Sequence, residues 1–391
     1  MIFTEILIVI FLLLLGYNFK FLFKVFNSYD NSLLNKLFFY HLIASVAFFL
    51  LIMNQGGDAQ LYWFESYNFR YFTFDEIWEM VLRGSAAGNL LLINYFPAKV
   101  LELSFFTGNI IYGVLGYFSF VFIFAIIKEN YPDIYKLKKN KILGISLFPT
   151  FLFLPNLHFW TAGIGKDTLL FLCIALFAYS VGNIRKRIIG IIVSVLIGFT
   201  VRPHIVLFLV VAFGIAYALA GNLKGYQKVF IFVLFLLGFS SIFNYVVDFV
   251  QLENIELNTI QNFTEKKARN LGGGAGSAVD LNNYSYPFKV FTFLYRPLFF
   301  DAMNVLGLVA SFENLLWLIF SIKLFKSNLR NGFKNASVQI KGLCVFFIIG
   351  ACSFSLILGN LGIILRQKTP FIIALLVFGY GVFLNKRKQS V

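Results

Sequence analysis

Five cations stand beside the predicted starts of apolar helices, where they would meet backbone N–H groups that have no partner within the helix. They are Lys166 in GIGKDTLL, Arg202 and Arg296 in two Arg-Pro pairs, and Arg366 and Lys368 in RQKTP. Proline favours the first turn of a helix and keeps the preceding residue extended. Helix N-termini attract anions, and the arginine fork grips phosphate oxygens in pairs. The set predicts a phosphate site; the alternative is contact with ordinary lipid headgroups.

Three residues are candidates for proton transfer. Asp58, in GGDAQ, is interpreted as a base, a metal ligand or the cap of a glycine-rich turn. His204 follows Arg202-Pro203, and either transfers a proton, binds phosphate or is structural. Glu313 falls inside a predicted span, and a carboxylate there indicates function unless it is shown otherwise. Arg296 or Arg366 is its expected partner.

Two further residues are candidates for substrate binding. Asp167 follows Lys166 and either belongs to the anion site or simply favours a helix N-terminus. His158, in NLHFWTAG, is expected on the external side, in an interfacial aromatic belt or a sugar-stacking platform. His41 is expected to be structural. Because no H-x-x-H, C-x-x-C or HExxH spacing occurs, neither a metal site nor a cofactor is expected.

The composition predicts the elements that carry these residues. Of 391 residues, 59% are apolar and 13% are charged, about half the charge of a soluble chain. Apolar runs approach the roughly 20 residues that cross a bilayer as a helix. We therefore expect an all-α polytopic transmembrane bundle forming a single membrane domain over residues 1–391. The eleven predicted spans are 2–19, 37–53, 105–127, 142–156, 168–183, 188–201, 204–221, 229–247, 303–322, 342–358 and 370–384.

Charge orients this bundle. The loops on one predicted side hold 21 of the 33 Lys and Arg, and three of the 18 Asp and Glu. The positive-inside rule predicts that this side faces the cytoplasm, with the N-terminus outside and the C-terminus inside. The net charge of +15 is then explained by topology and anionic lipid, so no nucleic-acid partner is expected.

Two external loops are predicted, at about 54–104 and 248–302. In the first, Thr73 and Glu76 have the spacing of a capping box, with Phe72 and Ile77 as a hydrophobic staple. A short amphipathic helix should follow, with Ile77, Met80, Val81 and Gly84 on one face and Asp75, Glu79 and Arg83 on another. We expect it to lie on the membrane surface; the alternative is an ordinary capped loop helix.

The second external loop contains GGGAGS at 272–277. This stretch lacks the Gly-Lys-Ser/Thr ending of a phosphate-binding P-loop and has no preceding strand. A lid or hinge is the better interpretation.

With these features together, the chain resembles the O-antigen and exopolysaccharide repeat-unit polymerases, and more loosely the multi-spanning glycosyltransferases that use lipid-linked donors. The resemblance depends on many spans, a large external loop in the second half, and the short motifs GKD (165–167), RP (202–203), RP (296–297) and RQK (366–368). It implies a multi-pass protein of the bacterial cytoplasmic membrane that acts in surface polysaccharide synthesis.

The resemblance also implies a reaction. A glycan would pass from a polyprenyl diphosphate or phosphate carrier to an acceptor glycan on the external face, without a nucleotide sugar. Arg202, Arg296 and Arg366 would hold the leaving diphosphate, and His204 or Asp58 would take the acceptor proton. An acidic residue in the first external loop fits the broader group better than the polymerases. The implied partners are the lipid-linked glycan, membrane lipids and other polysaccharide-assembly proteins.

Two other functions fit parts of the pattern. A transporter or flippase for an anionic lipid-linked saccharide would also point cations and helix N-termini at its substrate. However, the sequence has no repeated pair of broken segments. A membrane acyltransferase would need an essential histidine, which His41, His158 or His204 could supply.

Overall fold

The computed structural model describes residues 2–68, 72–219, 284–302 and 304–388, and positions 225, 226, 229, 233, 279 and 281. Almost all of the predicted eighth span, the GGGAGS segment and most of the second external loop lie outside these residues. The chain forms two compact units. Unit 1 comprises Met1–Pro132 and Leu157–Val206, and unit 2 comprises Asp133–Asn156 and Leu207–Val391.

Helices dominate the described chain, and six of them are long and apolar enough to cross a membrane. The sequence prediction of an all-α membrane bundle is confirmed at this level. Strands are limited, in the described ranges, to one two-stranded hairpin. The six long helices cover Phe3–Leu22, Ser28–Gln55, Phe105–Asn130, Val305–Phe325, Val338–Ser355 and Leu361–Asn385.

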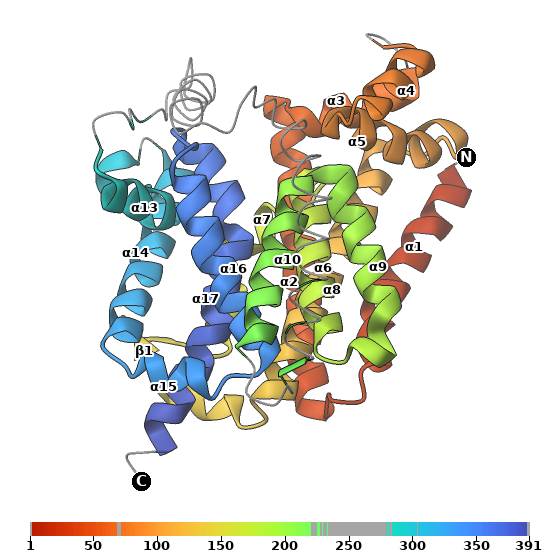
Figure 1. Ribbon diagram of the computed structural model, residues 1–391. Coiled ribbons are helices and arrows are strands. Elements are labelled where there is room, and N and C mark those ends of the chain that lie inside the picture. The colour runs from red at the N-terminus through yellow and green to blue at the C-terminus, as the bar shows by residue number, and fades with distance from the viewer. Residues whose placement is uncertain are drawn as a thin grey trace. The chain divides into compact units, whose positions relative to one another are not determined.

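Unit 1 combines long helices with a group of short helices at one end (Figure 1). Its long helices are α1 (Ile2–Asn18, continued by the 3-10 turn η1, Phe19–Leu22), α2 (Ser28–Gln55), α6 (Phe105–Asn130), α8 (Lys166–Val181) and α9 (Ile184–Val201). The short group comprises α3 (Asp58–Asn68), α4 (Phe74–Leu82), α5 (Ala86–Tyr95) and the π-helical turn η2 (Phe96–Val100). Residues 203–206 of α10 (Pro203–Ala218) complete the unit.

Contacts between helix ends show which way the helices of unit 1 run. Lys128, near the end of α6, pairs with Asp30 at the start of α2, with 3.3 Å between Nζ and Oδ2. At the opposite end, Glu5 in the first turn of α1 accepts a hydrogen bond from the backbone N–H of Ser104, just before α6, at 2.6 Å. Thus α1 and α6 are parallel, and α2 is antiparallel to both.

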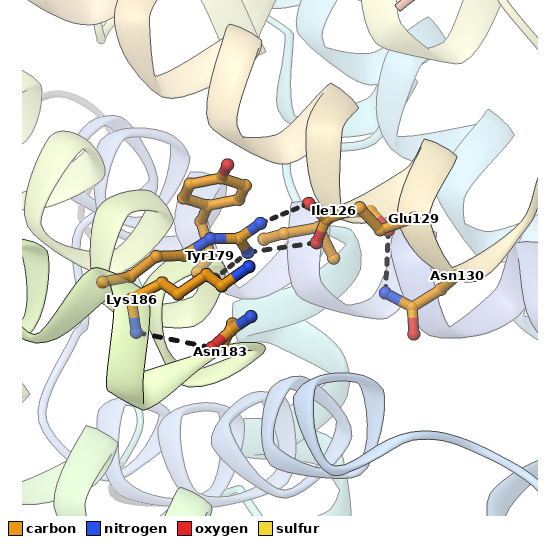
Figure 2. A network of polar contacts seen from close by, with 7 residues as sticks. Ile126, Glu129, Asn130, Tyr179, Asn183 and Lys186 are labelled. Carbon is orange, nitrogen blue, oxygen red and sulfur yellow. Dashed lines mark hydrogen bonds and ion pairs between the residues drawn. The ribbon is translucent and has the colours of Figure 1, made fainter. Parts of the chain in front are cut away.

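A network at the same end as Lys128 joins α9 to α6 and α8 (Figure 2). Arg187 donates to the Glu129 carboxylate at 3.1 Å and to the Tyr179 carbonyl at 2.9 Å. Its guanidinium also lies 3.7 Å from the centre of the Tyr179 ring, a cation–π distance. Because Glu129 lies near the end of α6 and Tyr179 near the end of α8, these two helices are parallel.

The chain between α6 and α8, residues 131–165, therefore returns from one end of unit 1 to the other. The sequence analysis predicted a helical span at 142–156, and this prediction is wrong. Pro149 and Pro155 lack backbone donors, and Leu143 and Gly144 adopt φ of +48° and +81°, so a continuous helix cannot form. The segment contains η3 (Ile134–Lys139), β1 (Lys141–Ile142), β2 (Ile145–Ser146), η4 (Thr150–Phe153) and α7 (Pro155–Phe159).

Within unit 2, the irregular residues 133–156 are packed against helices. Phe148 lies edge-on to Tyr380, and Phe151 lies edge-on to Trp317. The Tyr380 hydroxyl donates to the Leu147 carbonyl at 2.9 Å. Non-helical backbone is tolerated in a membrane protein only where protein or water satisfies its polar groups, and these contacts supply part of that requirement.

The remaining elements of unit 2 surround its long C-terminal helix, α17 (Leu361–Lys388). This helix contacts η3 and the four preceding described helices of the unit. The four helices are α13 (Tyr286–Tyr295), α14 (Val305–Phe325), α15 (Leu329–Lys334) and α16 (Val338–Ser355), and the 3-10 turn η5 (Phe299–Asp301) lies between α13 and α14 in the sequence. Residues 207–218 of α10 also belong to this unit.

The short helix predicted in the first external loop is confirmed as α4. Thr73 caps the N–H of Glu76 at 3.3 Å, and the Glu76 carboxylate accepts the Thr73 N–H at 2.7 Å, which together form the capping box. The predicted inner face is the covered one, since Ile77 is buried. Trp78 and Leu82 on the other side are exposed.

One glycine of α6 sets how closely the returning chain packs in unit 1. A Cβ at Gly116 would lie 1.9 Å from the Thr161 carbonyl oxygen and 2.7 Å from Nε2 of His41. Both distances are shorter than any real carbon contact, so the backbone at Thr161 approaches α6 only because this position has no side chain.

We therefore expect Gly116→Ala to lower the free energy of unfolding by about 1–3 kcal/mol, the usual cost of overpacking a core. Thermal unfolding of the purified protein, followed by intrinsic fluorescence, measures the change. Gly307→Ala is the matched control, because the nearest atom to its new Cβ would be 3.3 Å away. Equal shifts for the two variants would contradict the close packing at Gly116.

Candidate functional site

In unit 1 the structure brings together three of the predicted site residues, Lys166, Asp167 and Arg202, here called the helix-start cluster. Lys166 is the first residue of α8, and Arg202 immediately precedes Pro203, the first residue of α10. Both predicted helix starts are thus confirmed. Arg202 Nη2 lies 3.8 Å from Asp167 Oδ1, with 16% and 11% of the two side chains exposed.

The ends of two helices point toward this cluster. The N-cap of α8 is Gly165, which offers no side chain to the first backbone N–H groups of the helix. The first residue of α10 is proline, whose fixed φ suits a helix start. At 3.8 Å the Arg202–Asp167 contact is ionic without a hydrogen bond. Two cations, one carboxylate and two helix N-termini therefore leave a net positive environment.

Two of the short helices, α3 and α5, contact the helices of the cluster. The Lys166 ammonium lies 5.5 Å from the centre of the Tyr62 ring on α3. Asn89 on α5 donates to the carbonyl of Thr200, two residues before Arg202, at 2.7 Å. These contacts tie α3 to the start of α8, and α5 to the end of α9.

His204 lies on α10, which begins at the cluster, and Asp58 lies on α3, which contacts Lys166 through Tyr62. Asp58 is the exposed first residue of α3, after Gly56 and Gly57 with φ of +74° and +142°. It is four residues before Tyr62, and residues at this spacing share a helix face. His204 is the second residue of α10 and is half-buried.

A cavity of about 400 Å³ opens at the same end of unit 1, between α1, α3 and the start of α6. Its lining includes two carboxylates, Glu5 and Glu102, and two large aromatic side chains, Trp63 and Tyr67. Glu5 also accepts hydrogen bonds from Ser104 and Thr107. The sequence analysis did not identify this cavity, because its walls come from segments roughly 60 and 100 residues apart.

His158 is not on an external surface as expected. Its side chain is fully buried in unit 1, with its ring stacked on Phe120 at a centroid distance of 4.1 Å and an interplanar angle of 3°. Tyr40 lies edge-on to the same ring at 4.8 Å. A sugar therefore has no access to the stacking face that Phe120 occupies.

Arg296, in unit 2, does not stand at a helix start. It is the C-cap of α13, and α14 begins only at Val305 with Asn304 as its cap. Its Nε donates to Asp301 Oδ2 at 3.0 Å, its Nη2 donates to Asp301 Oδ1, and its Nη1 donates to the Tyr284 hydroxyl at 3.2 Å. The guanidinium is thus held by its own chain, five residues on.

The Arg296–Asp301 pair lies outside the long helices and changes how Asp301 titrates. Burial alone would raise the pKa of the Asp301 carboxyl, but hydrogen bonds from Arg296 and from the Leu298 N–H lower it overall. The hydrogen bonds from Arg296 to Asp301 and to Tyr284 raise the pKa of Arg296. The pair is therefore an ionic clasp that closes the turn between α13 and α14.

Arg366 and Lys368 also lie inside a helix rather than before one. The prediction that the last span opens at Pro370 is wrong, because α17 begins at Leu361 and Asn360 caps the N–H groups of residues 362 and 363. Arg366 is half-buried in the second turn of α17. Pro370 is accommodated within the helix, as is common in membrane helices.

Lys368 is buried and acts as a cross-link inside unit 2. Its ammonium donates to the carbonyls of Leu294 and Arg296 at 3.2 and 3.1 Å, and to Oδ1 of Asn314 at 2.6 Å. An ammonium has three N–H groups, so these three bonds use all of them. Asn314 in turn donates to the Pro297 carbonyl at 2.7 Å.

Glu313, next to Asn314 on α14, holds the irregular chain. Its Oε2 accepts from the backbone N–H and the side-chain amide of Asn156, at 2.9 and 3.0 Å. Trp317 Nε1 donates to the other oxygen at 3.4 Å. Arg296 and Arg366, its expected partners, do not form a recorded ion pair with it in the described part of the chain.

Sequence reasoning missed the amide of Asn314 and the carboxylate of Asp301, which satisfy these buried cations, and the helix cap Asn360. Asn314, Asn360 and Asp301 are polar residues in or beside apolar runs, and that position was the available signal. Across the described ranges, no group of three or more His, Cys, Asp or Glu is arranged to hold a metal ion.

Comparisons with known proteins found no matching family model, no matching curated protein and no matching solved structure.

The Lys368 cross-link predicts that Lys368→Met lowers the free energy of unfolding of the protein. The substitution leaves two carbonyls and one amide oxygen buried without their donor, and each such group costs about 1–3 kcal/mol. Lys323→Met is the matched control, because its ammonium donates to a single carbonyl, that of Lys141, at an exposed position. A thermal unfolding midpoint for Lys368→Met as high as that of Lys323→Met would contradict the cross-link.

The Arg296–Asp301 clasp is predicted to contribute to the free energy of unfolding, and this contribution should be lost in acid. Because the folded-state pKa of Asp301 lies below the unfolded value of about 3.9, its contribution is complete above that value and disappears as pH falls through the folded pKa. Unfolding midpoints measured from about pH 6 to about pH 3 should fall less steeply in Asp301→Asn and in Arg296→Gln than in the wild type. Asp133→Asn, at an exposed pair with Lys136, should keep the wild-type slope.

Proposed function

We propose that this protein is a membrane glycosyltransferase that transfers a glycan from a polyprenyl diphosphate, or phosphate, to an acceptor glycan. The helix-start cluster is the observation that carries this proposal. Lys166 and Arg202 lie beside the N-termini of α8 and α10, at the end of unit 1 that the short helices α3 to α5 cover. Such an arrangement suits a lipid-linked phosphate group at the membrane boundary.

The proposal includes an orientation in a bacterial cytoplasmic membrane. The end of unit 1 that holds Lys128 and Arg187 is proposed to face the cytoplasm, in agreement with the positive-inside rule. The helix-start cluster then faces outward.

The proposed chemistry is glycosyl transfer without a nucleotide. The bond from the anomeric carbon of the donor sugar to the phosphate oxygen breaks, and the acceptor hydroxyl oxygen forms the new bond. Arg202 and Lys166 bind the leaving phosphate, whose negative charge grows as the bond breaks. Asp58 is the proposed base, because it is exposed on the helix that contacts Lys166 through Tyr62.

The cavity lined by Trp63, Tyr67, Glu5 and Glu102 is the proposed site for the acceptor glycan. Aromatic rings pack against the apolar faces of sugars, and carboxylates accept hydrogen bonds from sugar hydroxyls. The cavity lies at the same end of unit 1 as Lys166. In this proposal Arg296, Lys368 and Glu313 stabilise unit 2 and do not touch the substrate.

The test uses purified protein in liposomes with a polyprenyl-diphosphate-linked glycan, and measures both transfer of the glycan and its movement across the bilayer. We expect Arg202→Ala to slow transfer by about 100- to 1000-fold, the usual cost of losing one donor to a developing negative charge. Arg202→Lys should recover part of the rate, because it keeps the charge but loses the fork.

Arg83→Ala is the matched control, since Arg83 is an exposed cation of the same short-helix group and pairs with Glu79 on α4. It should transfer at the wild-type rate. Full activity in Arg202→Ala would overturn the phosphate role of the cluster. Movement of the lipid-linked glycan by the wild type, without any transfer, would identify a flippase instead.

A further inference from the structure

Two of the three histidines face each other in the interior of unit 1. His41 lies on α2 and His158 on α7, and their Nδ1 atoms are 2.9 Å apart. Both side chains are fully buried. The two residues are separated by 117 positions in the sequence, so the fold alone brings them together.

The distance fixes the number of protons between the rings. A hydrogen bond between two imidazole nitrogens needs one N–H and one lone pair, so one Nδ1 carries a proton and the other does not. A second proton there would set two N–H groups face to face at 2.9 Å. The pair is therefore stable as two neutral rings of opposite tautomer that share one proton.

The surroundings of the pair provide little space for a charged ring. Phe120 of α6 covers one face of His158, and Phe171 of α8 packs edge-on to Phe120 at 5.2 Å. The titratable side chain in ring contact with His158 is Tyr40 of α2. The backbone groups of Gly113 on α6 and of Thr161 surround His41.

The pair holds the chain that leads into α8. Residues 157–165, here called the connector, pack directly on α2 and α6. Gly163 contacts the ring of Phe48 so closely that a Cβ would lie 2.0 Å from it, and Thr161 approaches Gly116 in the same way. Thr168 in the first turn of α8 donates to the Gly163 carbonyl at 2.6 Å. The position of the connector thus determines where Lys166 and Asp167 begin the helix.

We propose that His41 and His158 form a single-proton lock, which positions the connector and the start of α8 only while one proton is shared between the rings. Protonation of the Nδ1 that accepts the shared proton removes its lone pair, breaks the Nδ1–Nδ1 bond and releases the connector. Two buried imidazoles are costly where an apolar pair would fill the same space, which favours a use beyond packing. The role of the lock in activity, through the position of Lys166 and Asp167, rests on the proposed function. The existence of the lock does not.

Nitrogen-15 NMR of histidine-labelled protein tests the lock directly, with His204→Asn used to assign the third ring. We expect one protonated and one unprotonated Nδ1 for the pair at about pH 8, and joint protonation of both rings in a single step at lower pH. Hydrogen exchange of residues 157–165, corrected for its intrinsic pH dependence, should rise at least about tenfold over the same step. Independent titration of the two rings would overturn the lock.

The double variant His41→Leu/His158→Phe removes the shared proton and leaves neither ring nitrogen behind. Its connector should exchange without a pH step, whereas His204→Asn should keep the wild-type step. A pH step that persists in the double variant would also overturn the lock. If the double variant does not fold, the wild-type NMR titration still decides the question.

The lock and the proposed function fail in different ways. If Arg202→Ala transfers glycan normally while the rings protonate together, the proposed function fails and the lock stands. Transfer that needs Arg202 but has the same pH profile in the wild type and in the double variant would give the opposite result. The lock would then have no role in activity, and the proposal that the lock positions Lys166 would be refuted.

Discussion

The backbone of residues 131–165 must find hydrogen-bond partners without forming one continuous helix, and much of the polar interior serves this need. Within unit 2, Glu313 accepts the N–H of Asn156, and Tyr380 donates to the carbonyl of Leu147. Within unit 1, Thr161 donates to the carbonyl of Leu157 at 2.7 Å. An unsatisfied backbone group in lipid costs several kcal/mol, so side chains placed this way are part of the fold before they are part of any site.

Two cations of unit 2 serve the same need. Lys368 and Arg296 are bonded to carbonyls, an amide and a carboxylate of unit 2 at hydrogen-bond distances. Arg202, in unit 1, meets Asp167 at the longer distance of 3.8 Å and lies beside two helix N-termini. Sequence alone treated all of them as one set because each cation stands close to an apolar run and a proline.

Local signals in the sequence correctly predicted three helix starts. GKD before α8, Arg202-Pro203 before α10 and the Thr73 capping box before α4 all act within one helical turn. The predictions at Arg296 and Pro370 failed because asparagines at 304 and 360 cap the helices instead. Apolar content correctly indicated a membrane bundle, but at 142–156 it could not distinguish a lipid-facing helix from chain buried inside the protein.

The overall distribution of charge does not explain why an anion would bind at the helix-start cluster, but the local charge there does. Outside the loops predicted to face the cytoplasm, the sequence has 15 of its 18 acidic residues and only 12 of its 33 basic ones. A polyanion drawn by net charge alone would therefore go to the opposite end. Lys166 and Arg202 against one carboxylate leave a charge of +1 where α8 and α10 begin. Each of these N-termini adds about half a positive charge, and the C-terminus of α9, which Arg202 caps, adds about half a negative charge. In the proposed function, local geometry, and not the +15 of the whole chain, would therefore set the affinity of this end for phosphate.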